Sequence, residues 1–342
     1  LQPSEHVFEV EENEFILEAA LRQGIAFPYG CRSGSCGTCL GKVVSGEIEY
    51  PEGLPLTVME HEHEQGRAVF CVSVAKSDLE LEVNEVSSSG DIEVKLLPAR
   101  VVSLRKLAGD VMEMMLKLPE SERLAFRAGQ YLEFIMRDKS RRAFSIANSP
   151  SNDEYLELHL RLVPDGKFTD HVFNQMQEKA LVRIAGPLGS FYIRENSNRP
   201  LILIAGGTGF APIKGMLEQL IEQADTRPVH LYWGARAKDD LYRDDLAEKW
   251  AFQHDHIEYI PVLSDVEAED NWQGRSGFVH DAVAEDFTDL SGHDVYMAGP
   301  PVMINAAKEK FAQQGLPIDQ LFSDSFEYAA VSQSKIEKSA QK

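Results

Sequence analysis

The sequence predicts three domains of different fold class: a small α+β domain, an antiparallel β-barrel and an α/β doubly wound domain. Three observations predict this division. All four cysteines lie in the first quarter of the chain, short alternating strands fill the middle, and near-continuous apolar strands alternate with amphipathic helices toward the end. We place the domains at residues 1–88, 94–196 and 198–330, followed by a C-terminal tail at 331–342.

The first domain is predicted from a strand, a helix and a loop rich in cysteine. Residues 6–12 alternate apolar and polar side chains and predict a strand, and residues 15–24 predict a helix that Gly24 ends. After the cysteine loop, residues 41–50 predict a pair of strands. Serine and glycine then become frequent, so residues 84–93 are a predicted linker.

The middle domain consists of short runs with alternating apolar and polar residues, separated by turns at regular intervals. This pattern is typical of a small antiparallel barrel. The predicted strands are residues 99–107, 111–118, 130–136, 154–163 and 180–186.

The last domain has strands that are apolar along almost their whole length, which is typical of a parallel sheet covered by helices on both faces. A doubly wound nucleotide-binding domain is therefore expected. The predicted strands are residues 201–207, 229–235, 257–264 and 294–300, and the predicted helices are residues 211–224 and 300–314.

The four cysteines form the strongest motif. Cys31 and Cys36 are separated by four residues, Cys36 and Cys39 by two, and Cys71 follows after thirty-one more. This is the ligand spacing of a plant-type 2Fe-2S cluster, whereas structural zinc sites usually have two short Cys-x2-Cys pairs and this chain has one. Small residues between the cysteines let backbone N–H groups approach inorganic sulfide. Zinc or unligated structural thiols remain the alternatives.

A glycine-rich turn opens the last domain. The strand at 201–205 leads into Gly207, Thr208 and Gly209, and a helix follows at once. Glycine amides and a helix N-terminus at one point make an anion site suited to a pyrophosphate. Pro212 fits the first turn of that helix, where its missing N–H costs nothing. A tight turn without a ligand is the alternative.

Two segments of the middle domain carry groups that suit a phosphorylated, aromatic cofactor. Arg142 can neutralise a phosphate, Phe144 can lie against a flat ring, and Ser145 can hydrogen-bond a polar ring edge. Further on, Gly166 and Thr169 bracket a turn that offers backbone donors and a hydroxyl to another phosphate. Each segment alone is also compatible with ordinary structure.

Taken in order, these motifs resemble the ferredoxin–NAD(P)H reductase superfamily over essentially the whole chain. The stretches "YGCRSGSCGTC", "FSIANSP", "YWGAR" and "LFSDSFE" are similar to the reductase components of bacterial oxygenases and, more closely, to CDP-6-deoxy-glucoseen reductases. The resemblance implies a ferredoxin (β-grasp) fold for the first domain, FAD in the barrel and a nicotinamide nucleotide on the last domain.

The resemblance also implies the members of each site. The metal ligands are Cys31, Cys36, Cys39 and Cys71. The expected FAD contacts are Arg142, Ala143, Phe144, Ser145, His159, Leu160, Arg161, Gly166, Lys167, Phe168 and Thr169. The expected contacts of the nicotinamide nucleotide are Gly207, Thr208, Gly209, Pro212, Gly234, Arg236, Ser264, Asp265, Gly299, Pro300 and Met303. Ser145 and Phe326 are the expected catalytic residues. Phe326 resembles the residue that shields the flavin in relatives. Core packing is the alternative for Phe326, and a purely structural role is the alternative for His159.

One position departs from the family pattern. Many relatives have Cys-Gly-Pro beside the nicotinamide, whereas this chain has Ala298, Gly299 and Pro300. A side chain that helps to position the reacting ring is absent, and we still expect hydride transfer.

The implied activity is an NAD(P)H-dependent reductase that passes electrons from NADH to FAD, then to the 2Fe-2S cluster, then to a partner protein. A flavin is needed because NADH delivers two electrons at once and the cluster accepts one. The partner is an oxygenase component or a sugar-deoxygenation dehydratase. A stand-alone NADH:flavin or ferric reductase is the alternative, and a non-catalytic redox sensor is a third reading, which the complete nicotinamide-binding half disfavours.

Composition limits the partners. The net charge of −21 opposes binding to nucleic acid or to anionic lipid. Residues 1–90 carry 16 acidic and 5 basic side chains, so a protein acceptor with a basic docking patch suits this domain. No secretory signal or membrane-spanning run is evident, and cysteines reserved for a cluster suggest the cytoplasm. We expect a monomer.

NADH is the expected donor in preference to NADPH. Where NADPH-dependent relatives have a Ser-Arg pair, this chain has Ser264 and Asp265, and a carboxylate there repels the 2′-phosphate. Arg236 and Arg275 could approach the same pocket and act in the opposite direction.

We predict about two iron, two acid-labile sulfide and one FAD per chain, because four thiolates of this spacing hold one 2Fe-2S cluster. Metal, sulfide and flavin analysis of anaerobically purified protein checks the prediction. Stoichiometric zinc without labile sulfide would refute the cluster assignment.

Overall fold

The structure is a computed structural model that describes residues 1–34, 36–55, 57–85, 92–266 and 271–326. It divides into two compact units. Among the described residues, unit 1 comprises those of 1–93 with 189–191 and 323–325, and unit 2 comprises the others. The predicted tail at 331–342 and most of the predicted linker lie outside the described residues. No helix in the described ranges is both long and apolar enough to cross a bilayer.

The N-terminal region of unit 1 is a small α+β fold built on one main helix. Its elements are α1 (Ile16–Arg22), β1 (Leu40–Ser45), β2 (Ile48–Glu49), α2 (Glu60–Glu64), β3 (Arg67–Val69), β4 (Val74–Ala75) and β5 (Glu80–Glu82). The strands form an antiparallel sheet in the order β3-β1-β5 and a small sheet of β2 and β4. Ile16 and Leu17 of α1 are fully buried against Phe27 and Phe70. Gly24 ends the helix at φ +79°, as predicted.

One prediction for this domain is wrong and a second is confirmed only in part. Residues 6–12 do not form a strand, because the side-chain amide of Gln23 takes both backbone hydrogen bonds of Glu9. Residues 41–50 contain two strands, β1 and β2, as predicted, but these strands do not pair with each other. Gly46, at φ +95°, turns the chain so close to Asp78 that a Cβ would lie 2.2 Å from its carbonyl oxygen, and β2 pairs with β4 instead.

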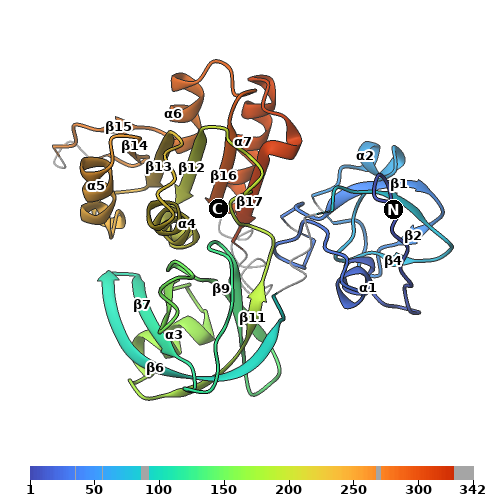
Figure 1. Ribbon diagram of the computed structural model, residues 1–342, viewed down its shortest axis with the longest axis horizontal. Helices are drawn as coiled ribbons and strands as arrows, with labels where there is room; N and C mark the ends of the chain where they lie inside the picture. The colour runs from blue at the N-terminus through green and yellow to red at the C-terminus, as the bar shows by residue number, and fades with distance from the viewer. Residues whose placement is uncertain (35, 56, 86–91, 267–270, 327–342) are drawn as a thin grey trace. The chain divides into compact units, whose positions relative to one another are not determined.

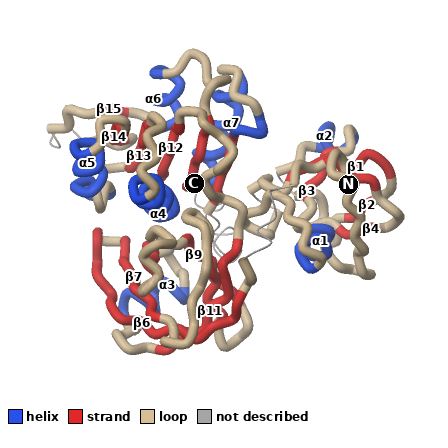
Figure 2. Tube along the Cα trace, in the orientation of Figure 1, coloured by secondary structure: helices blue, strands red, loops and turns tan. Residues whose placement is uncertain are grey.

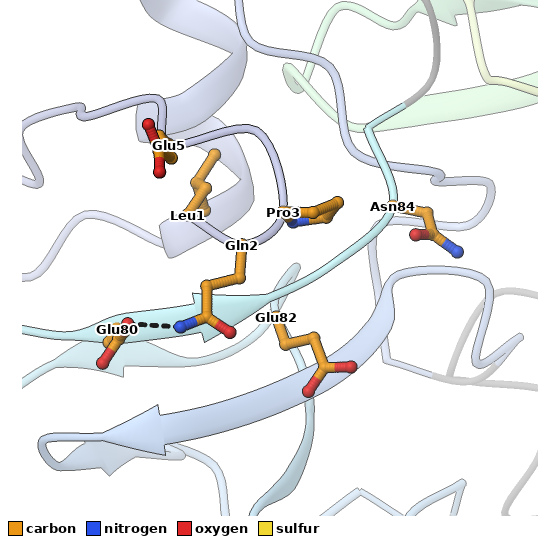
Figure 3. A pocket seen from close by; sticks show the side chains of 7 residues that line it. All are labelled: Leu1, Gln2, Pro3, Glu5, Glu80, Glu82 and Asn84. Carbon is orange, nitrogen blue, oxygen red and sulfur yellow. Dashed lines mark hydrogen bonds between the residues drawn. The ribbon is translucent and has the colours of Figure 1, made fainter.

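A surface hollow of about 630 Å³ lies where the first residues run beside β5. Gln2 exchanges backbone hydrogen bonds with Leu81 and Val83 there. Figure 3 shows the carboxylates of Glu80 and Glu82 at this hollow. The hollow is acidic, and none of the predicted site residues lines it.

The first part of unit 2 is the predicted antiparallel barrel, which is confirmed. Its elements are β6 (Lys95–Ala108), β7 (Val111–Lys117), β8 (Tyr131–Ile135), β9 (Arg141–Ser145), β10 (Leu156–Arg161), α3 (Lys167–Asn174) and β11 (Leu181–Leu188). The strand order is β10-β7-β6-β11-β8-β9. A bridge between Ile146 and Leu158 connects the two edges. Figure 2 shows that strands and loops make up this part, with α3 as its helix.

The second part of unit 2 is the predicted parallel α/β fold. Its elements are β12 (Leu201–Gly206), α4 (Phe210–Glu222), β13 (Val229–Ala235), α5 (Asp244–Gln253), β14 (Ile257–Leu263), β15 (Arg275–Ser276), α6 (Val279–Asp286), β16 (Asp294–Gly299) and α7 (Pro301–Gln313). The sheet also includes β17 (Leu321–Ser325), whose last three residues are counted with unit 1. The sheet order is β15-β14-β13-β12-β16-β17, and α4 and α5 lie on the opposite side of it from α6 and α7 (Figure 1).

The order of these strands locates the binding edge. The chain builds β12, β13 and β14 outward and then crosses back to place β16 on the other side of β12. In open parallel sheets, ligands bind outside the carboxyl ends of the strands where the direction of winding reverses. That point is the gap between the ends of β12 and β16.

Candidate functional site

The cysteine loop aims backbone N–H groups at its own sulfurs. The Sγ of Cys31 accepts hydrogen bonds from the backbone N–H of Ser33 at 3.5 Å and of Cys36 at 3.3 Å. The Sγ of Cys36 accepts from the N–H of Cys31 and of Thr38, both at 3.5 Å. Gly34 at φ +82° lets the loop curl in this way. Such N–H donors stabilise thiolate ligands and tune the potential of a bound cluster.

The four thiols interact and none forms a disulfide. The hydrogen bond from the thiol of Cys36 is the main cause that holds the pKa of Cys31 well below its usual range, and the hydrogen bond from the thiol of Cys71 adds to it. The pKa of Cys71 is raised, because its thiol bonds Cys31 and Cys39. Cys36, Cys39 and Cys71 are buried. The loop therefore stabilises a thiolate, which is the form that binds metal.

The spacing of the sulfurs fits a cluster better than one zinc ion. Four sulfurs around a single zinc lie about 3.8 Å apart, since each Zn–S bond is about 2.3 Å. Among the described residues, the only set of three or more ligand atoms that all lie within 4.8 Å of one another is Glu113, Glu157 and His159. The cysteines form no such tight set, as expected for ligands shared between two iron ions.

The glycine-rich turn and the end of β16 are in backbone contact. A Cβ on Gly209 would lie 1.9 Å from the carbonyl oxygen of Ala298. A Cβ on Gly206 would lie 2.6 Å from Sδ of Met303, and one on Gly299 would lie 2.8 Å from Cε of the same residue. The two predicted nucleotide segments are thus one site at the gap between β12 and β16.

The remaining predicted residues at this edge follow. Thr208 is buried in the 3₁₀ turn Gly207–Gly209, and Pro212 lies in the first turn of α4. Pro300 precedes α7, and the backbone N–H of Phe326 donates to the carbonyl of Gly299 at 3.0 Å. The turn therefore presents helix N-terminal amides, which suit a pyrophosphate.

Two side chains from other strands organise the turn. The indole N–H of Trp233 donates to the carbonyl of Gly207 at 3.0 Å. Gly207 has φ +53°, and a Cβ on it would lie 2.8 Å from Nη1 of Arg161. Arg161 also pairs with Asp110 at 3.0 Å. Its guanidinium therefore lies at the turn predicted to bind the nicotinamide nucleotide, although the resemblance placed it among the FAD contacts.

The Arg-x-aromatic-Ser segment forms the edge strand β9. Arg142 is half-buried, Ala143 is exposed and Ser145 is buried. Phe144 packs against Phe134 and Phe168, with ring centroids 5.7 and 5.6 Å apart.

The segment 166–169 is the start of a helix. Gly166 precedes α3, and the exposed Lys167 is its first residue. The hydroxyl of Thr169 donates to the carbonyl of Gly166 and accepts from the N–H of Val163, both at 3.1 Å. The hydroxyl that we expected to meet a phosphate thus closes the turn, and the first-turn amides of α3 are the groups left for a ligand.

His159 and Leu160 have side chains committed to the protein. Nδ1 of His159 is 3.0 Å from the hydroxyl of Tyr242, and Nε2 is 2.9 Å from Oε1 of Glu157. Leu160 is part of the barrel core. These two side chains are therefore no longer part of our proposed flavin site.

The residues at the ends of β13 and β14 separate into two groups. A Cβ on Gly234 would lie 2.8 Å from Cβ of Val279, so this glycine permits close packing of α6. Arg236, Ser264 and Asp265 are at the strand ends, where Asp265 is exposed and its N–H donates to the carbonyl of Arg236 at 3.0 Å. The latter three can meet a ribose.

Unit 2 contains a set of buried charges that its sequence hardly reveals. Lys214 and Glu157 are almost fully buried and 3.0 Å apart. The only signal was a lysine within the apolar stretch "FAPIKGML".

Three family models match separate parts of the chain. Residues 1–76 match the 2Fe-2S iron-sulfur cluster binding domain, residues 98–193 the oxidoreductase FAD-binding domain, and residues 203–309 the oxidoreductase NAD-binding domain.

Characterised relatives match nearly the full length. The chain is 41% identical over 326 residues to the CDP-6-deoxy-L-threo-D-glycero-4-hexulose-3-dehydrase reductase of Yersinia pestis, covering 95% of this chain and 97% of that protein. It is 36% identical over 335 residues to the phenol 2-monooxygenase reductase component DmpP of Pseudomonas sp., covering 96% and 94%. Among solved structures, the Amycolatopsis cytochrome P450 reductase GcoB is similar with a TM-score of 0.78 and 32% identity, over 95% of this chain and 98% of that chain.

We predict that Gly209→Ala disrupts nucleotide binding while the barrel still holds FAD. The added methyl would meet the Ala298 carbonyl at 1.9 Å, and backbone atoms cannot move aside cheaply. We expect at least a tenfold weaker Kd for NADH and a loss of stability of about 1–3 kcal/mol. Nucleotide titration and flavin content measure the two effects. Gly109→Ala is the matched control, because a Cβ there meets nothing within 4 Å. Equal NADH affinity in both variants would contradict the assignment of the turn.

Proposed function

Because the chain belongs to the ferredoxin–NAD(P)H reductase superfamily, in the group with an N-terminal 2Fe-2S domain, we propose that it takes electrons from NADH and delivers them to a separate acceptor protein. It is an NAD(P)H-dependent oxidoreductase with FAD and a 2Fe-2S cluster, as the sequence predicted. The flavin, when bound, accepts a hydride and releases single electrons.

One observation carries the proposed order. The same chain holds a nucleotide turn built on Gly209 and a thiolate loop whose N–H groups point at sulfur. A hydride donor and a one-electron carrier in one chain require a converter between them. The residues that we propose to hold FAD in the barrel are Arg142, Ser145 and the first-turn amides of α3. Hydride transfer to a flavin requires no general base. Phe326 is the proposed shield of the flavin, since its backbone is bonded to Gly299.

The proposed acceptor is an oxygenase component or a sugar dehydratase with a basic docking patch. Of the two relatives compared, the dehydrase reductase is more similar, at 41% against 36% identity. The first domain offers acidic side chains, including Glu60, Glu62 and Glu64 on α2, a helix without buried residues. Because all four cysteines are assigned to a cluster and none to a disulfide, we propose a reducing cytoplasm as the compartment. We also propose that the protein is a monomer and that its three domains span residues 1–88, 94–196 and 198–330.

The charges near Asp265 support NADH as the donor. The guanidinium of Arg275 is paired with Asp286, at 2.7 and 2.9 Å, and also donates to the carbonyl of Ala282. Arg236 is exposed, and its Nε lies 3.6 Å from Oδ2 of Asp240, a longer and weaker ion pair than that of Arg275 with Asp286. One of the two opposing arginines is thus neutralised, and the carboxylate of Asp265 is left to repel a 2′-phosphate.

Replacing Cys36 with serine should leave flavin reduction by NADH nearly intact and abolish electron transfer to one-electron protein acceptors such as cytochrome c. The reason is that hydride transfer precedes the cluster. Stopped-flow absorbance separates the two steps. The control is the unmodified protein prepared in parallel with matched FAD content. Loss of both steps with FAD fully bound would show that the order is wrong, and retained cytochrome c reduction would favour a stand-alone flavin reductase.

We expect NADH to be preferred over NADPH by about tenfold in kcat/KM, since one unfavourable contact of about 1.4 kcal/mol gives that ratio. Asp265→Arg should narrow the gap, and steady-state kinetics with both nucleotides measure it. Asp255→Arg is the matched control, because Asp255 is exposed just before the other end of β14. Equal efficiencies in the unmodified protein would mean that Arg236 outweighs the aspartate.

A further inference from the structure

Helix α4 presents a charged stripe to the barrel. Lys214, Glu218 and Glu222 are spaced by four residues and therefore share one face of the helix. Glu218 accepts from the N–H of Ser149 at 3.2 Å, and Glu222 accepts from the hydroxyl of Ser149. Figure 1 shows α4 on the side of the parallel sheet that faces the barrel. The helix that follows the nucleotide turn is thus bonded directly to the segment that follows β9.

Lys214 is the centre of this stripe. It is 3% exposed, and its ammonium contacts the carbonyl oxygen of Ala147 at 3.0 Å, Oε2 of Glu157 at 3.0 Å and Oε1 of Glu218 at 2.8 Å. These three acceptors match the three N–H donors of an ammonium. A buried charge is tolerated only with such partners, so its position is narrowly defined.

A second layer holds Glu157. Burial would raise the pKa of Glu157, but the hydrogen bond from His159 and the charge of Lys214 bring it to about 2. Burial lowers the pKa of His159, so its imidazole is neutral. An ionised carboxylate can only accept hydrogen bonds, so the Nε2–H of His159 donates to Glu157. The unprotonated Nδ1 then accepts a hydrogen bond from the hydroxyl of Tyr242.

Glu113, Glu157 and His159 lie close enough together to suggest a metal site, but two basic side chains already bond the carboxylates. Arg105 bonds Glu113 at 2.7 and 2.9 Å, and Lys214 bonds Glu157. Protein cations already balance these carboxylates.

The next residue shows how closely the helix approaches. A Cβ on Gly215 would lie 3.0 Å from the carbonyl oxygen of Asn148 and 3.3 Å from that of Ile146. The backbone of α4 therefore packs on the backbone of residues 146–148, with no side chain between them. Two independent features, an ion network and a glycine contact, fix the same pair of segments.

These segments continue into the two proposed cofactor sites. Ala147 is two residues beyond Ser145, and Lys214 is five residues beyond Gly209 along a rigid helix, or about 7.5 Å. We propose that Lys214 is a positioning residue for hydride transfer: it fixes the nicotinamide turn relative to the flavin-binding strand. This inference rests on the proposed function, in which NADH reduces the flavin first. A misplacement of about 1 Å can slow such a reaction about a hundredfold.

The test is a variant of the full-length holoprotein that removes the network without leaving a buried charge unpaired: Lys214→Met with Glu157→Gln and Glu218→Gln. We expect the maximal rate of flavin reduction at saturating NADH to fall at least tenfold, with the Kd for NADH changed less than threefold. Hydrogen exchange should rise in residues 145–149 and 207–213. The matched control is Lys310→Met, which removes an ion pair with Asp281 between α6 and α7.

An unchanged maximal rate, or a lower melting temperature with no change in rate, would overturn the proposal and leave Lys214 a structural residue. If the triple variant does not fold, Gly215→Ala gives the decision, because it keeps every charge and only pushes α4 from residues 146–148. A rate several-fold lower supports the proposal, and an unchanged rate refutes it. Failure of NADH to reduce the flavin of the unmodified protein would instead refute the proposed function.

Discussion

The arrangement of unit 2 depends on one backbone contact, that of Gly209 with the carbonyl of Ala298. The ends of β12 and β16 meet at the point where the sheet reverses its winding, and a Cβ on Gly209 would lie 1.9 Å from that carbonyl oxygen. Because the chain passes this point without a side chain, α4 can begin at Phe210 with its first amides at the nucleotide edge. The direction of α4, and everything bonded to it, follows from this contact.

The charged stripe of α4 then connects the sheet to the barrel. A buried ion pair contributes little net stability, because desolvation of both charges offsets their attraction. Its geometry, by contrast, is demanding. Lys214 must meet Ala147 and Glu157 of the barrel while it also bonds Glu218 on its own helix, so few relative positions of the two domains satisfy it. The network therefore acts on orientation more than on stability, and orientation is what hydride transfer between two bound rings requires.

The fold could be predicted from the sequence where the pattern is local and long. The apolar strands of the parallel sheet were found within one or two residues, and the spacing of Cys31, Cys36 and Cys39 indicated the cluster. The strand predicted at residues 6–12 fails at Glu9, whose backbone N–H and carbonyl are both bonded by the side chain of Gln23, 14 residues further along the chain. Strand β9 and helix α3 were missed as elements because each was interpreted as a ligand-binding segment. The sequence of β9 is short and polar, whereas α3 buries Phe168, Thr169 and Val172 at a helical spacing that was overlooked.

In the candidate site, too, residues in a local sequence pattern could be predicted, whereas residues that depend on distant partners could not. Motif residues such as Gly209 and Asp265 could be located because they follow predicted strands. Lys214 could not, because its partner Glu157 is 57 positions away and a single lysine in an apolar helix has no periodic signal. His159 was placed among the FAD contacts by resemblance alone, and only the structure shows both ring nitrogens bonded within the protein.

The alanine at position 298 can be understood from the same contact. Ala298 is fully buried, and the group that meets the turn is its backbone carbonyl, which every residue type provides. The change from the cysteine of many relatives therefore leaves the close approach at Gly209 intact. A methyl group stands where the family pattern has a thiol, so the side chain of residue 298 adds no polar group to the nucleotide edge. Under the proposed function, the close approach of Gly209 to residue 298 and the bonds of Lys214 to the barrel are the contacts through which we expect this chain to align the two cofactor sites.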